Sequence, residues 1–141
     1  MIGVYSATMK TALRWLLTVF MVAAGLNHFL SPDAYAAMMP SALPAPLELV
    51  YASGIAEILG GLGLVLAQTR RSAGWGLIAL FIAIFPANLN MAVNHLPLAG
   101  RALPSWALWS RLPLQLVLIA WAYWYTRPPV LAQARDRIAA G

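Results

Sequence analysis

Four long apolar stretches constrain the fold of this chain more than any other feature. They cover about residues 11–30, 46–67, 73–93 and 105–126. A helix of roughly 20 apolar residues spans the hydrocarbon core of a bilayer, which is about 30 Å thick. Charged residues make up only 9% of the chain, whereas a soluble domain usually carries about 25%. The sequence therefore predicts an all-α fold, an integral membrane four-helix bundle.

Turn-forming residues separate the four stretches, as expected for helix ends. They are Ser31-Pro32-Asp33, Pro44 with Pro46, Gln68 to Arg71, and Pro97 to Pro104. Proline suits the first turn of a helix because that turn does not need its missing N–H donor. We expect one transmembrane domain over residues 1–126, followed by a short basic cytoplasmic tail over 127–141.

The basic residues predict the orientation of the bundle. Seven of them flank one side of the predicted membrane: Lys10, Arg14, Arg70, Arg71, Arg127, Arg135 and Arg137. Cytoplasmic loops are enriched in Lys and Arg, so both termini are expected in the cytoplasm and the loops 31–45 and 94–104 outside. The net charge of +5 is spread over an apolar chain. It therefore indicates topology rather than nucleic-acid binding.

A shift of 67 residues superimposes several parts of the sequence. Asn27-His28 falls on Asn94-His95, and the segment 46–50 falls on 113–117. The bundle is thus expected to consist of two pseudo-repeated helical hairpins, a parallel repeat of the kind found in some membrane proteins. Chance matching in a sequence rich in Leu and Ala is the alternative.

Polar residues gather in the outer half of the predicted bundle, where each needs a partner because hydrocarbon offers none. They are Asn27 and His28 on the first helix, Glu57 on the second, Asn88, Asn90 and Asn94 on the third, and Arg111 and Gln115 on the fourth. We predict a ligand-binding site formed by Asn27, His28, Glu57, Asn88, Asn90, Arg111 and Gln115.

Glu57 is the most informative of these residues. It lies about 16 Å from the outer end of its predicted helix, at 1.5 Å per residue. Arg111 is the only cation in the same half of the bundle that could reach it. The sequence predicts a buried Glu57–Arg111 ion pair, which needs good geometry and further hydrogen bonds to be favourable. Two interpretations remain open. The cluster is either interhelical hydrogen bonding or a ligand or proton site in which Glu57 is the catalytic acid and base.

Several other site types are not expected. The absence of cysteine excludes disulfides, iron–sulfur clusters and thiolate zinc sites. His28 and His95 could only supply haem ligands from two helix ends, with no pocket indicated, so neither haem nor a metal ion is predicted. Glycines of the second helix predict close packing. Pro86 predicts a kink and a free carbonyl near Ile82.

Three segments together resemble a known family. They are Gly25-Leu26-Asn27-His28-Phe29, the stretch Ser53-Gly54-Ile55-Ala56-Glu57-Ile58-Leu59-Gly60-Gly61, and Phe85-Pro86-Ala87-Asn88-Leu89-Asn90-Met91. In these segments the chain resembles the DoxX-like family of small four-helix bacterial membrane proteins, over about residues 11–126. The resemblance implies the bacterial cytoplasmic (inner) membrane, a redox neighbourhood and quinone as the natural lipophilic partner.

Three functions follow from these patterns. The first is an accessory or anchoring subunit of a membrane redox system, an oxidoreductase subunit that binds a protein partner and a quinone. The second is a small membrane enzyme that acts on a lipophilic substrate with Glu57 as acid and base. The third is a non-catalytic binding or structural subunit.

Overall fold

The computed structural model describes residues 2–98 and 101–127, and this part of the chain is all-helical. It contains five helices: α1 (Ile2–Leu30), α2 (Pro32–Ala36), α3 (Pro46–Gly63), α4 (Arg70–Val93) and α5 (Ser105–Thr126). No strand occurs within these ranges; an isolated bridge joins Leu98 and Arg101. The expected tail with Arg135 and Arg137 lies outside the described residues.

The helices differ from the expected ranges at four places, one of which is the start of α4 at Arg70 instead of about residue 73. α1 begins at Ile2 instead of about residue 11, and α2 forms where the sequence suggested only a loop. α3 ends at Gly63 rather than Ala67. At that end the Thr69 hydroxyl donates to the Gly63 carbonyl (2.9 Å), and the Arg70 guanidinium donates to the next two carbonyls. Side chains of the turn thus replace the helical donors that the last carbonyls lack.

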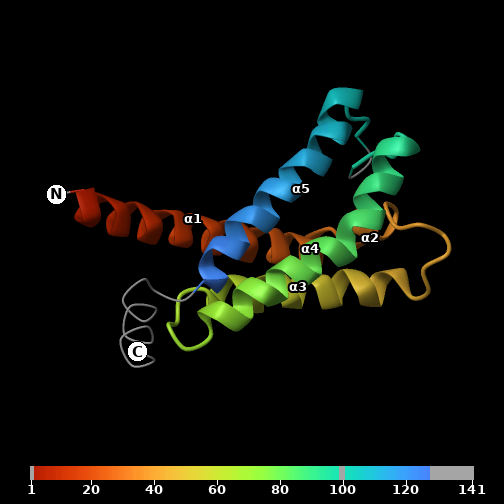
Figure 1. Cartoon of the computed structure of the whole chain (residues 1–141). Coiled ribbons are helices and arrows are strands. Elements are labelled where there is room, and N and C mark those ends of the chain that lie inside the picture. Colours follow the sequence, from red (N-terminus) through yellow and green to blue (C-terminus); the bar gives the residue numbers. More distant parts are fainter. Residues whose placement is uncertain (1, 99–100, 128–141) are drawn as a thin grey trace, which may run out of the picture.

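The long helices pack as two pairs of chain neighbours, α1 with α3 and α4 with α5, and α3 contacts α4 to join the pairs. Figure 1 shows the first pair running side by side and the second pair rising away from it at an angle. The short helix α2 lies against α1 and α3. The pairing agrees with an arrangement of two hairpins.

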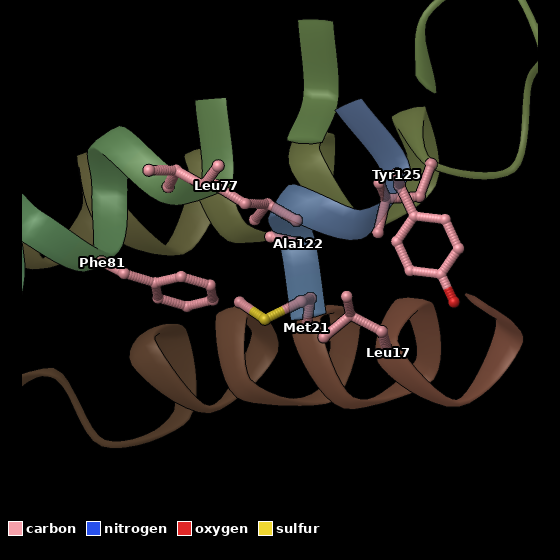
Figure 2. Packing of buried hydrophobic residues seen from close by; sticks show 8 residues of the cluster. Leu17, Met21, Leu77, Phe81, Ala122 and Tyr125 are labelled. Atoms are coloured by element: carbon pink, nitrogen blue, oxygen red, sulfur yellow. The ribbon is translucent and has the colours of Figure 1, made fainter. Parts of the chain in front are cut away.

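Apolar side chains fill the space between the two pairs. Figure 2 shows the core residues Leu17 and Met21 of α1, Leu77 and Phe81 of α4, and Ala122 and Tyr125 of α5. All of them are buried. This core lies in the half of the molecule that contains the α3–α4 connection, and the polar residues lie beyond it.

Large apolar side chains also cover much of the outside. Leu16, Val19, Leu59, Ile82 and Leu116 each expose more than half of their surface. Two helical segments, Ala7–Leu30 and Arg70–Val93, are long and apolar enough to cross a membrane, with mean hydropathies of 1.4 and 1.9.

Candidate functional site

A cavity of about 330 Å³ lies between the two helix pairs, and residues of α1 to α5 line it. Five of the residues predicted for the site contribute to its wall: His28, Glu57, Asn88, Arg111 and Gln115. The cavity therefore brings together side chains that come from four long helices and from positions up to 87 residues apart in the chain (115 − 28 = 87).

Two glycines place His28 and Glu57 beside each other. A Cβ atom added to Gly25 would lie 2.6 Å from the Gly54 carbonyl oxygen, so α1 and α3 touch through their backbones here. His28 and Glu57 each follow one of these glycines by three residues, on the same helix face. The His28 Cβ occupies the space above Gly54, and the Glu57 Cβ occupies the space above Gly25. Each glycine thus makes room for the polar side chain of the other helix. The close packing predicted for the glycines of the second long helix is found at Gly54.

Glu57 pairs with His28, not with Arg111. The His28 Nε2 and the Glu57 Oε2 are 3.7 Å apart, and the two residues are 7% and 5% exposed. Arg111 instead directs its Nη1 to the Met91 sulfur at 3.5 Å. The predicted Glu57–Arg111 ion pair is therefore wrong. The close approach of α1 and α3 at Gly25 and Gly54 brings the His28 imidazole to the carboxylate instead.

The other side of the imidazole ring is held by α3. Its Nδ1 lies 3.1 Å from the Val50 carbonyl oxygen and 2.9 Å from the Ser53 hydroxyl. The Ser53 hydroxyl donates to the same Val50 carbonyl at 2.8 Å. In the tautomer with the proton on Nδ1, the ring donates to the Val50 carbonyl, because a carbonyl can only accept. In either tautomer Nε2 is the nitrogen that faces Glu57.

Ser53, His28 and Glu57 have the residue types of a nucleophilic triad, but their hydrogen bonds differ from one. In a triad the serine hydroxyl donates to the histidine, which accepts the proton as general base. Here the Ser53 hydroxyl donates to a backbone carbonyl instead. Ser53 also lies at Nδ1 and Glu57 at Nε2, whereas a triad places the serine at Nε2 and the carboxylate at Nδ1. The arrangement orients His28 towards Glu57 and does not activate Ser53.

The Glu57 oxygen that faces His28, 3.7 Å from its Nε2, is not hydrogen-bonded to any described residue. This oxygen, Oε2, is buried. Leaving a buried acceptor unsatisfied costs about 1–3 kcal/mol, so buried polar atoms of this kind call for an explanation. Since Glu57 lines the cavity, a hydrogen-bond donor inside the cavity would satisfy this oxygen.

The opposite wall is built by α4 and α5 around amide side chains. The Asn88 Nδ2 donates to the Gln115 Oε1 at 3.1 Å, and the Gln115 Nε2 donates to the Phe81 carbonyl. Pro86 lies inside α4 in this region, and it lacks the N–H donor that would serve the Ile82 carbonyl in a regular helix. The Gln115 amide thus donates to the Phe81 carbonyl. This carbonyl is next to that of Ile82, near which the sequence predicted a free carbonyl.

Asn27 and Asn90 lie outside the cavity, unlike the other predicted site residues. The Asn27 Nδ2 donates to the Tyr35 hydroxyl at 2.7 Å, and the Asn90 Nδ2 donates to the Met38 carbonyl at 2.9 Å. Both bonds fix the segment around α2, whose Tyr35 and Met38 line the cavity. The two asparagines therefore support the wall instead of forming it.

His95 also lies away from the cavity. It follows the end of α4 with a left-handed backbone (φ 51°), is exposed, and lies 3.3 Å from the Ser105 hydroxyl through its Nε2. The matching Asn-His pairs of the two hairpins thus have different surroundings. His28 lies inside α1, whereas His95 lies beyond the end of α4.

Sequence reasoning missed two polar residues of the cavity, Tyr35 and Ser53. The Tyr35 ring lies 4.1 Å from the His28 ring, centre to centre. Ser53 precedes Glu57 by four residues, so its helical spacing indicates the same face and would have identified it. No such signal exists for Tyr35, because the sequence did not predict α2.

The remainder of the wall is apolar, with Phe20, Met21, Phe81, Ile84, Leu114 and Leu118. Ligand pockets are typically apolar with a few placed polar groups, at roughly 300–1,000 Å³. This cavity fits the lower end of that range. Its size suits a single substituted ring or a comparably small lipophilic group.

Comparison with known proteins gives one match. No curated protein and no solved structure matches the chain. The family model described as a domain of unknown function (DUF8561) matches residues 17–126, and the chain belongs to this family.

Proposed function

We propose that this protein is an accessory or anchoring subunit of a membrane redox system and that its cavity binds a lipophilic ligand, with a quinone as the first candidate. In this proposal α1, α3, α4 and α5 span the bacterial cytoplasmic membrane as a four-helix bundle, and both termini are cytoplasmic.

The distribution of side chains supports the membrane location. Apolar residues are exposed along the outside of the helices, while His28, Glu57 and Gln115 are buried between them. This is the reverse of a soluble protein, which covers itself with charged groups. Lys10, Arg14, Arg70, Arg71 and Arg127 lie together at one end of the molecule, as the positive-inside rule requires of a cytoplasmic face.

The single observation that carries the ligand proposal is the pairing of two polar walls across an apolar cavity. On one wall the Glu57 Oε2 lacks a donor. On the other, Arg111 has only the Met91 sulfur as a hydrogen-bond partner among the described residues, although a guanidinium has five N–H donors. A quinone carries two oxygens on opposite sides of an apolar ring. One can accept from Arg111, and in the reduced form the other can donate to Glu57.

The resemblance to the DoxX-like family supports the redox part of the proposal. That family is associated with membrane redox systems, and its name derives from a subunit of a quinone-linked oxidoreductase. The exposed apolar faces of the helices offer surfaces for a second membrane subunit as well as for lipid.

The test is purification from native membranes at natural expression in a maltoside detergent, followed by mass spectrometry of co-purifying lipids and proteins. We expect quinone with the wild-type protein and its loss in Glu57→Gln and Arg111→Gln. Arg101→Gln is the matched control, because Arg101 is an exposed cation away from the cavity. Recovery of neither quinone nor a partner protein would contradict the proposal. So would variants that change only the thermal unfolding midpoint, since the polar cluster would then serve only to join the helices.

A second candidate is an enzyme that uses Glu57 as acid and base on a lipophilic substrate. The burial of Glu57 in the cavity wall, with no hydrogen bond to its Oε2 among the described residues, favours it, because intramembrane carboxyl groups are functional candidates by default. Turnover of membrane lipids or quinols by the isolated protein, abolished by Glu57→Gln and partly kept by Glu57→Asp, would support this alternative. No turnover without a partner protein would favour the accessory subunit.

A further inference from the structure

A second cavity, of about 450 Å³, lies at the opposite end of the core from the first. It is bounded by α1, by the α3–α4 connection and by the end of α5, which lies beside that connection in Figure 1. Five cationic residues line it: Lys10, Arg14, Arg70, Arg71 and Arg127. Three hydroxyl side chains, those of Thr11, Tyr125 and Thr126, complete its polar lining.

No acidic residue of the described part balances these charges. Asp33, Glu48 and Glu57 all lie elsewhere, and none of them lines this cavity. The fourth acidic residue of the chain, Asp136, falls outside the described residues. Arg14 and Arg70 are close enough for their charges to repel each other. Five cations around one cavity, with no acidic residue among the described residues that line it, create a strongly positive potential, which attracts an anion.

Three of the cations also have structural partners. Arg70 donates to the Leu64 and Val65 carbonyls. The Lys10 ammonium lies 5.2 Å from the Trp124 ring centre, and the Arg127 guanidinium lies 5.0 Å from that of Tyr123. These contacts are within the range of cation–π attraction. They hold the three cations around the cavity.

Arg14 and Arg71 have no such partner. The Arg14 Nε is buried and lacks a hydrogen-bond partner among the described residues. No hydrogen bond or ion pair of the described part involves Arg71, which is exposed at the start of α4. A buried N–H donor of a cation that is left unsatisfied is costly. An oxyanion at this position would satisfy Arg14 and share its charge with Arg71.

We infer that this basic cavity binds a phosphate-bearing anion, and that the headgroup of an anionic phospholipid is its natural source. Guanidinium groups bind phosphate oxygens through paired, charge-assisted hydrogen bonds. Trp75, Tyr123 and Trp124 are exposed at this end of the molecule, and such rings mark the depth of lipid headgroups. The inference rests on the membrane location proposed above, but it is independent of the ligand in the first cavity.

The experiment is a titration of the purified full chain in dodecyl maltoside, whose headgroup carries no phosphate to compete. The ligands are a short-chain phosphatidylglycerol, the corresponding phosphatidylcholine and inorganic pyrophosphate. Tryptophan fluorescence reports binding, because Trp124 lies against Lys10 at the cavity. We compare the wild type with Arg14→Gln/Arg71→Gln and use Arg101→Gln as the control with an unrelated cation removed. Arg70 is kept, since it caps α3.

Phosphatidylglycerol is expected to bind more tightly than phosphatidylcholine. The double variant should bind it about 25-fold more weakly, at roughly fivefold for each cation near the headgroup, and Arg101→Gln should bind like the wild type. Saturable binding of pyrophosphate with the same loss in the double variant would support the site and assign it to a soluble phosphate.

Equal binding of both lipids, or an equal loss in Arg101→Gln, would overturn the inference while leaving the quinone experiment untouched. Carbonate extraction of the wild-type protein from membranes would instead overturn the membrane location and therefore both proposals.

Discussion

The two helix pairs are held together in different ways. α1 and α3 meet through backbone, with Gly25 against Gly54 and with the Gly61 carbonyl accepting from the Thr18 hydroxyl at 3.0 Å. α4 and α5 also approach through backbone at Gly74, but away from the cavity. Beside the cavity they meet through side chains, above all Asn88 and Gln115. A backbone contact has no rotamers to adjust, whereas amide side chains can move. The cavity therefore has one wall of fixed geometry, which carries His28 and Glu57, and one that side-chain movement can adapt.

The largest effect is expected from a methyl group added where α1 and α3 meet through their backbones. In Gly25→Ala the new Cβ would lie 2.6 Å from a backbone oxygen and 2.7 Å from the Ile58 side chain. We expect destabilisation by about 3 kcal/mol, the upper part of the usual range for overpacking, measured by circular dichroism during detergent-induced unfolding.

Gly76→Ala is the matched control for this substitution. Gly76 also lies within a helix, but a Cβ there would meet nothing within 4 Å. The variant should be unchanged or more stable by up to about 1 kcal/mol, because alanine favours the helix more than glycine does. If Gly25→Ala behaves like Gly76→Ala, α1 and α3 do not meet through their backbones.

An intermediate effect is expected on the adaptable side. Gln115→Leu removes the hydrogen bonds to Asn88 and to the Phe81 carbonyl, so we expect a loss of about 2 kcal/mol in unfolding free energy. The double variant with Asn88→Leu should lose less than the sum of the single variants, by about 0.6 kcal/mol, a typical coupling energy for membrane helices. Strict additivity would show that the Asn88–Gln115 bond does not join α4 to α5.

The smallest effect is expected from a hydroxyl on the rigid side. Thr18→Val keeps the shape of the side chain and removes only the bond to the Gly61 carbonyl. We expect a loss of about 0.6 kcal/mol, smaller than that of Gln115→Leu, in the same unfolding measurement. A larger loss than in Gln115→Leu would reverse the comparison, since the α1–α3 pair would then depend on a side-chain hydrogen bond.

The sequence predicted the elements that depend on local patterns. Runs of apolar residues and the prolines that bound them are local signals, and they indicated four long helices. Five of the seven predicted site residues line the same cavity because polar groups buried between apolar helices must gather around shared partners.

The errors concern features that depend on how the helices approach each other. The partner of Glu57 is set by the Gly25–Gly54 contact, which involves residues 29 positions apart (54 − 25 = 29). The sequence indicates only the depth of each residue along its helix, and by depth alone Arg111 is the expected partner of Glu57. The roles of Asn27 and Asn90 likewise depend on α2, a five-residue helix that is too short to show a periodic pattern.

The hydrogen bonds of His28 bear on where the His28–Glu57 pair takes up a proton. When Nδ1 carries the proton that it donates to the Val50 carbonyl, the ring takes up a further proton at Nε2, the atom that faces Glu57. A proton added there lies between side chains of two helices, His28 of α1 and Glu57 of α3. Its gain or loss therefore changes the attraction across the α1–α3 contact.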